Sequence, residues 1–131
     1  MSVAMAFRSW ADGAVAGSIP DEARAFSFNL YEHSDSFAME LIGCPEYDAD
    51  NEDWACREIF AYRDPLFELP HVVVGSKWQE GLATGVRLVK EYLRASGPGH
   101  RLYRAEAVAV GFVDGDLELV WANGREQGCA P

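Results

Sequence analysis

The chain has 131 residues, of which 49% are hydrophobic and 24% charged, and its formal net charge is −10 at pH 7. This length and composition predict a single domain over residues 1–131, with a core large enough to fold without a metal or disulfides. The acidic excess argues against binding to nucleic acid or to an anionic membrane, because Lys and Arg make those contacts. A basic protein partner would instead be attracted.

The cysteines and the first residues bear on where the protein works. Cys44, Cys56 and Cys129 include no CxxC pair, which is typical of reduced thiols in a cytoplasmic protein. The chain begins without the basic leader of a signal peptide, and no apolar stretch approaches the ~18 residues of a membrane span. We therefore expect a cytoplasmic protein.

Alternating polarity predicts strands in the first half of the chain. Residues 26–32 and 37–42 each place apolar side chains on one face, and the polar residues 33–36 between them fit a hairpin loop. Residues 57–63 are expected to form a third strand. An irregular, proline-containing passage follows.

The one helix that the sequence predicts runs from about Lys77 to Ala95. Ser76 and Gln79 form a capping box at its start, and Gly97 ends it. Its apolar positions recur every three or four residues and form a stripe that should face the core. The stripe consists of Trp78, Leu82, Val86, Val89 and Leu93.

The final predicted element is a hairpin. Residues 107–113 and 116–121 have strand character, and the Asp114-Gly115 dipeptide between them is typical of a type I′ turn with a structural role. Strands, then a helix, then a hairpin indicate an α+β fold. We expect an antiparallel sheet built from hairpins and packed against one principal helix at about residues 77–95.

An acidic segment between the second and third predicted strands is the candidate binding surface. It comprises Glu46, Asp48, Asp50, Glu52, Asp53, Trp54 and Glu58. Arg57 is the only basic residue in 46–58, so the local charge is strongly negative. Tryptophan is enriched at binding hot spots, but this indole could equally anchor the segment to the core. The run could also be a solvated loop that only keeps the protein soluble.

Metal binding and catalysis have weaker support in the sequence. An EF-hand loop starting at Asp48 would carry Asp53 where glycine is required and Ile59 where the bidentate glutamate belongs. The cysteines and histidines lack the close-paired spacing of zinc sites, and none of the common catalytic motifs occurs. We therefore expect no metal, no cofactor and no catalytic residues.

Three stretches resemble the pattern of small acidic immunity proteins, which are encoded beside bacterial polymorphic or secretion-delivered toxins. They are FNLYE (28–32), MELIGCPEYDADNEDWACREIF (39–60) and VGFVDGDLELVW (110–121), and the resemblance covers residues 26–121. In that pattern an acidic residue follows Trp-Ala-Cys, whereas this chain has Arg57. The resemblance implies a monomer or weak homodimer that binds a cognate, basic toxin or effector domain and occludes its active site.

Two other functions stay open at this stage. A small-molecule or peptide-binding regulatory module would use a pocket between the predicted helix and the sheet, lined by Tyr31, Tyr62 and Trp78. The third alternative is an enzyme whose site is assembled from residues far apart in the sequence.

Overall fold

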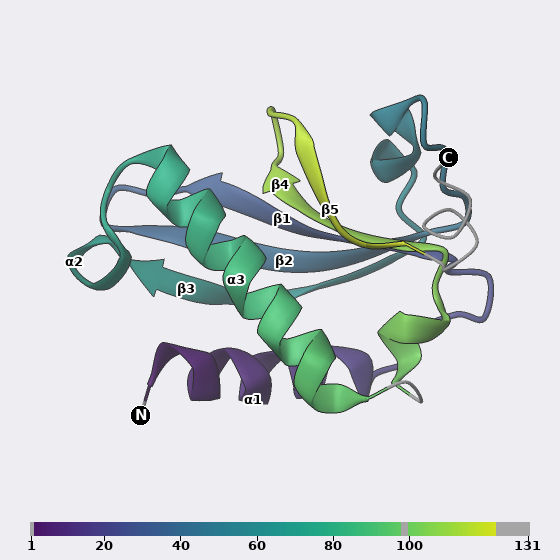
Figure 1. Ribbon diagram of the computed structural model, residues 1–131, viewed down its shortest axis with the longest axis horizontal. Coiled ribbons are helices and arrows are strands. Elements are labelled where there is room, and N and C mark those ends of the chain that lie inside the picture. The colour runs from purple at the N-terminus through teal and green to yellow at the C-terminus, as the bar shows by residue number, and fades with distance from the viewer. Residues whose placement is uncertain (1, 98–99, 123–131) are drawn as a thin grey trace.

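The computed structural model describes residues 2–97 and 100–122 and contains a five-stranded sheet with helices packed against one face (Figure 1). Across the sheet the strands lie in the order β3–β2–β1–β4–β5. The strands are β1 (Ala25–Glu32), β2 (Ser36–Cys44), β3 (Phe60–Pro70), β4 (Ala107–Phe112) and β5 (Leu117–Ala122). The helices are α1 (Val3–Val15), α2 (His71–Val74) and α3 (Trp78–Ser96), with short 3₁₀ helices η1 (Glu52–Cys56) and η2 (Arg101–Arg104).

The sheet is mostly antiparallel. β2 runs antiparallel to both β1 and β3, and β5 runs antiparallel to β4. β1 and β4 are parallel neighbours, because the chain leaves the sheet after β3 and returns to it after α3. The α+β prediction is therefore confirmed, and one central pair of strands differs from the expected antiparallel arrangement.

Helix α1 was not predicted. The Met5 N–H donates to Ser2 Oγ at 3.1 Å, so Ser2 caps its first turn. The Phe7 ring is buried, with its centroid 5.4 Å from that of Phe67 and 5.8 Å from that of Tyr92. The core thus lies between the sheet and two helices, α1 and α3, where the sequence had predicted only one.

Helix α3 confirms the predicted helix with its first residue one position later. Lys77 is the N-cap, and its N–H donates to Glu80 Oε1 at 3.0 Å, so the expected capping box of Ser76 and Gln79 was wrong. The stripe residues that reach the core are Leu82, Val86, Val89 and Leu93. The exception is Trp78, which is 51% exposed and belongs to the surface.

The passage after residue 63 is not irregular. β3 continues through Pro65 to Pro70 at one edge of the sheet, a position that tolerates proline because the outer side of an edge strand makes no ladder hydrogen bonds. The Trp10 indole N–H donates to the Pro65 carbonyl oxygen at 2.8 Å. This bond ties α1 to the edge strand.

The turn between β4 and β5 is not type I′. Neither Asp114 nor Gly115 has a positive φ angle, and residues 113–116 connect the end of β4 to the start of β5. The Gly115 N–H donates to the Phe112 carbonyl oxygen at 3.0 Å. A Cβ at Gly115 would lie 3.7 Å from Phe112 Cβ, an ordinary contact, so the turn does not require glycine there.

A partly buried hydrogen-bonded group of Asp12, Tyr92 and His100 joins α1, α3 and the N-cap of η2. The Tyr92 hydroxyl donates to Asp12 Oδ1 at 2.7 Å and lies 3.0 Å from His100 Nε2. His100 Nδ1 accepts from the Leu102 N–H at 3.1 Å, so the neutral ring carries its proton on Nε2 and donates it to Tyr92. Burial lowers the pKa of His100, although the charge of Asp12 acts in the opposite direction.

Because His100 is held neutral in this group, we expect the protein to lose stability in mild acid. The unfolded chain gains a proton at His100 as the pH falls through about 6.5, whereas the folded chain resists protonation, so the free energy of unfolding should decrease from about pH 7.5 to 5.5. His100→Asn keeps an acceptor for the Leu102 N–H and cannot titrate. Urea unfolding at several pH values should show a flatter dependence of the unfolding free energy on pH for His100→Asn than for the parent protein. An unchanged slope in His100→Asn would contradict this assignment.

Candidate partner-binding surface

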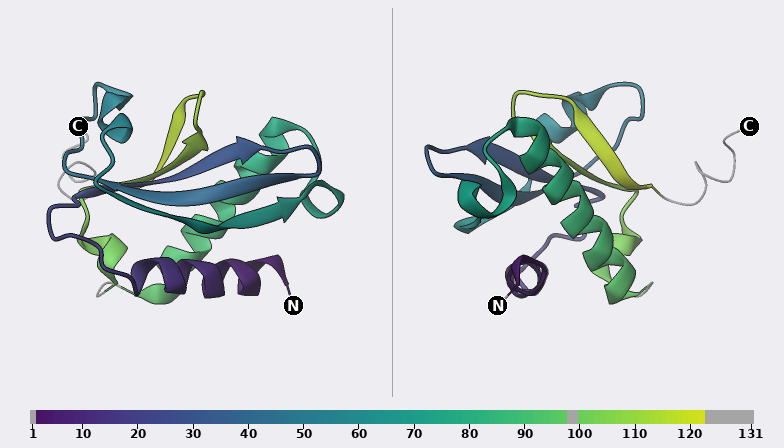
Figure 2. Two further views of the ribbon diagram at one scale, coloured as in Figure 1. Left: turned by 180° about the vertical axis from the view of Figure 1, so that it is seen from behind. Right: turned by 60° about the vertical axis from the view of Figure 1, so that its left-hand side comes forward.

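The acidic segment lies on the face of the sheet opposite α1 and α3. Figure 2 shows the connection from β2 to β3, with η1 in it, on the far side of the strands from both helices. The alternation along β1 agrees with this, because Phe26 and Phe28 point into the main core while Ala25 joins a second apolar cluster. The segment therefore covers part of the sheet face that the helices leave open.

Trp54 anchors this segment. Its side chain is only 5% exposed and packs in the second cluster with Ile42, Cys44 and Ala109. The Tyr47 ring lies against it edge-on, with the ring centroids 5.6 Å apart. Of the two roles considered for the indole, the structure supports the anchor and leaves little of the ring for a partner to touch.

The carboxylates around Trp54 are exposed and partly fixed by local bonds. The exposed set is Glu46, Asp48, Asp50, Glu52, Asp53 and Glu58. Asp48 Oδ1 accepts from the Asp50 N–H at 2.9 Å, and Asn51 Oδ1 accepts from the Asp53 N–H at 2.9 Å at the start of η1. These two bonds order the backbone of the segment and fix the Asp48 carboxylate on the surface.

The β4–β5 hairpin lies beside η1, which the sequence did not indicate. The Leu117 N–H donates to Glu52 Oε2 at 3.3 Å, so the acidic segment and the hairpin are in direct contact. A cleft of about 370 Å³ lies between them, with Tyr31 and Glu40 among its lining residues. From the hairpin, Val113, Gly115 and Leu117 also line this cleft.

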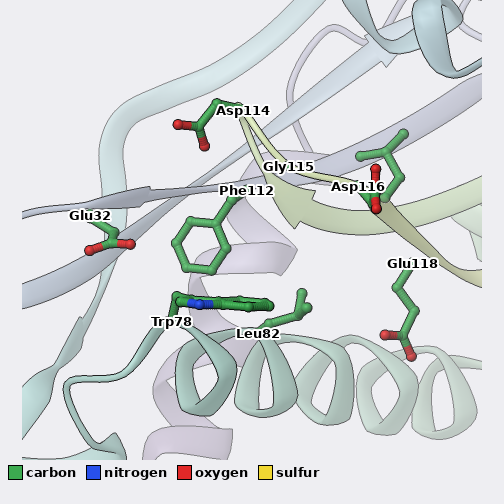
Figure 3. A pocket seen from close by; sticks show the side chains of 9 residues that line it. Glu32, Trp78, Leu82, Phe112, Asp114, Gly115, Asp116 and Glu118 are labelled. Atoms are coloured by element: carbon green, nitrogen blue, oxygen red, sulfur yellow. The ribbon is translucent and has the colours of Figure 1, made fainter.

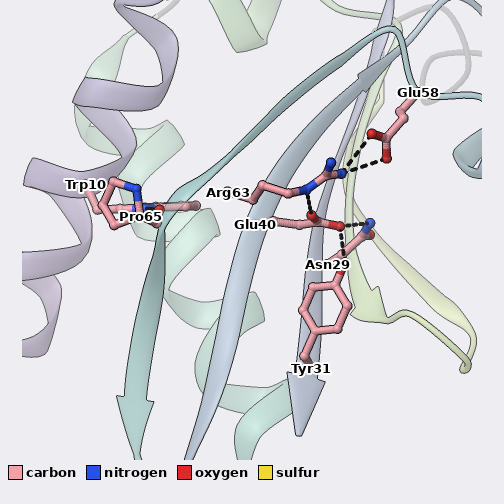
Figure 4. A network of polar contacts seen from close by, with 7 residues as sticks. All are labelled: Trp10, Asn29, Tyr31, Glu40, Glu58, Arg63 and Pro65. Atoms are coloured by element: carbon pink, nitrogen blue, oxygen red, sulfur yellow. Dashed lines mark hydrogen bonds and ion pairs between the residues drawn. The ribbon is translucent and has the colours of Figure 1, made fainter. Parts of the chain in front are cut away.

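A network of polar contacts centred on Glu40 borders this cleft (Figure 4). Glu40 is 2% exposed, and its carboxylate accepts hydrogen bonds from the Tyr31 hydroxyl, from Asn29 Nδ2 at 3.0 Å and from Arg63 Nε at 2.7 Å. Arg63 Nη2 also contacts both oxygens of Glu58 at 2.8 and 2.9 Å. Arg63 therefore links the buried carboxylate to the end of the acidic segment.

The pKa values follow from these contacts. Burial would raise the pKa of Glu40, but the hydrogen bonds from Tyr31, Asn29 and Arg63 outweigh it and lower that pKa. Burial and the hydrogen bond to Glu40 raise the pKa of Tyr31 to about 12. At neutral pH Glu40 is thus an ionised carboxylate that faces a neutral phenol and a guanidinium.

The three aromatic residues expected to line a pocket between the helix and the sheet do not converge. Tyr31 faces the Glu40 network, Tyr62 packs against Trp10 with ring centroids 5.7 Å apart, and of the three only Trp78 lines a groove between α3 and the sheet. The expected lining by all three residues was therefore wrong. The described cysteines are free thiols; Cys129 lies outside the described residues. Over residues 2–97 and 100–122, no three His, Cys, Asp or Glu side chains are grouped to hold a metal ion.

Comparison with known proteins gives no relative for this chain. No family model, no curated protein and no solved structure matches it. In the part of the chain that the structure covers, the helices are too short or too polar to cross a bilayer.

The Glu40 network makes a prediction about stability. Glu40→Ala should lower the free energy of unfolding by about 2 kcal/mol, because it leaves the half-buried Tyr31 hydroxyl and Asn29 amide without their acceptor and removes the buried partner of Arg63. Glu58→Ala removes the other, exposed partner of Arg63 and should cost less than about 1 kcal/mol. Urea unfolding of both variants checks this. Equal losses would mean that the buried contacts contribute no more than the exposed ion pair.

Proposed function

We propose that this protein binds a basic protein partner and blocks its functional site, as an immunity protein does to its cognate toxin. The observation that carries the proposal is the acidic segment, whose exposed carboxylates are held on the sheet by the buried indole of Trp54. A rigid charged surface loses little conformational freedom when a partner binds, which favours affinity. A solvated loop that served only solubility would not need this anchor.

Charge supports the same partner class. The chain carries a net charge of −10, and complementary charge can raise association rates toward roughly 10⁸–10⁹ M⁻¹s⁻¹ at low salt. Enzymes that act on nucleic acids or nucleotides bind phosphate through basic grooves. Carboxylates presented in fixed positions would occupy such a groove and exclude the anionic substrate, so inhibition would be steric and electrostatic and would require no catalysis by this protein.

The toxin as partner rests on the resemblance of residues 26–121 to acidic immunity proteins. Such a protein acts in the cytoplasm of the cell that makes the toxin, where the chain must remain soluble before it meets its partner. A high negative charge and a well-packed core suit that requirement. The proposed complex therefore joins this chain, as a monomer or weak homodimer, to a basic toxin domain encoded beside its gene.

Co-expression with that neighbouring toxin domain tests the proposal. The parent protein should restore growth and form a complex whose association slows as salt is added. Asp50→Lys should reduce the association rate at low salt about fivefold and flatten its salt dependence, because a charge at an interface acts mainly on the encounter. Glu91→Lys, which makes the same charge change on exposed α3, is the matched control and should have a smaller effect.

Two outcomes would contradict the proposal at different levels. Absence of both protection and binding would remove the immunity role. Protection with equal association rates for Asp50→Lys and Glu91→Lys would keep that role and place the interface outside the acidic segment.

A further inference from the structure

A groove of about 520 Å³ lies between the first turn of α3 and the β4–β5 hairpin (Figure 3). Its apolar wall is formed by Trp78, Leu82 and Phe112. Carboxylates stand around this wall, from Glu32 at one end to Glu118 at the other. The acidic segment does not line this groove, which is a separate feature of the surface.

The aromatic wall is held in place and yet open to solvent. Trp78 is 51% exposed at the first position of α3, and its indole lines the groove together with the ring of Phe112 (Figure 3). Phe112 is half-buried, and its ring centroid is 5.7 Å from that of Phe37, which is fully buried. The aromatic surface of the groove therefore consists of the exposed Trp78 indole and the Phe112 ring, which packs on the main core.

Three carboxylates at the groove have no cationic partner among the residues that the structure describes. Glu32, Asp114 and Asp116 are exposed and make no side-chain hydrogen bond or ion pair with any residue in 2–97 or 100–122. Glu118 differs, because it also borders a hollow lined by the basic residues of α3, including Arg87. The strongest uncompensated negative charge lies at the hairpin turn and at Glu32.

We propose that this groove binds the guanidinium group of an arginine presented by the protein partner, an inference that rests on the proposed function and names the partner's anchor. A planar cation is attracted to the face of an indole, and its forked N–H donors can bond carboxylates at the same time. An apolar side chain would use the aromatic wall but leave the carboxylates unpaired. An anion would be repelled by them.

The groove and the acidic segment can serve one interface. Phe112 and Leu117 line both the groove and the cleft beside η1, so the hairpin is the wall between the two. A partner that straddles the hairpin would place one arginine against Trp78 and spread its remaining positive charge over the segment. The segment would accelerate the encounter, and the groove would set the position of the bound partner.

The test uses the full chain and a tetra-arginine peptide followed by NMR. All four tryptophans, Trp10, Trp54, Trp78 and Trp121, lie in the described part of the chain, and only Trp78 is exposed. Its indole N–H resonance should shift on titration. Trp78→Leu, which keeps an apolar surface residue, should weaken peptide binding about threefold. Asp114→Asn with Asp116→Asn should weaken it more, by about tenfold.

Matched controls distinguish binding in the groove from general attraction between a cationic peptide and an acidic protein. Asp50→Asn with Asp53→Asn removes the same charge from the segment and should leave the shift of the Trp78 indole resonance in place. Tetra-lysine should bind more weakly than tetra-arginine, because an ammonium cannot stack on the ring as a guanidinium does. Equal binding of the two peptides would overturn the assignment of arginine.

The outcomes distinguish this inference from the proposed function. A titration that moves resonances of residues 46–58 but not the Trp78 indole would overturn the groove site and leave the acidic surface as the interface. No binding to either feature at millimolar peptide would also overturn the groove site. A specific Trp78 shift, together with no complex between the protein and the neighbouring toxin, would support the arginine site and remove the immunity role.

Discussion

Burial of the Trp54 indole against the open face of the sheet is the interaction on which the acidic surface depends. The strand residues that it packs with, such as Ile42 and Ala109, belong to the second apolar cluster. A run of neighbouring carboxylates repels itself and would not order alone. Apolar burial of this one side chain offsets that repulsion and holds the charges at the surface.

Two further contacts hold the segment on either side of Trp54. Glu52 accepts from the backbone of the β4–β5 hairpin, and Glu58 is held by Arg63, whose other contact is the buried carboxylate of Glu40. The open face of the sheet is thus apolar under Trp54 and ionic under the cleft. Because the same hairpin also walls the Trp78 groove, the segment and the groove are placed relative to each other by one element.

Much of the fold could be predicted where a local pattern decides the structure, as in the alternation of residues 26–32. Helix α1 had a readable signal, since Ser2 precedes Phe7 and Trp10 at helical spacing, and it was missed. The Glu40–Arg63 ion pair could not be predicted from the sequence, because it depends on how β2 and β3 are aligned, and their register shifts after Met39. The exposure of Trp78 likewise depends on tertiary packing, since the helical periodicity of the sequence places it in the core stripe.

The central claim is that Trp54 fixes the acidic segment, and amide hydrogen exchange tests it most directly. Trp54→Ala should lose protection over residues 46–59, including the Ile59 N–H that donates to the Gly43 carbonyl oxygen at 2.8 Å, while β1 and the rest of β2 stay protected. Trp78→Ala, a surface tryptophan, should exchange as the parent does. Parent-like protection of this segment in Trp54→Ala would show that the carboxylates are held without the indole, and would contradict the account.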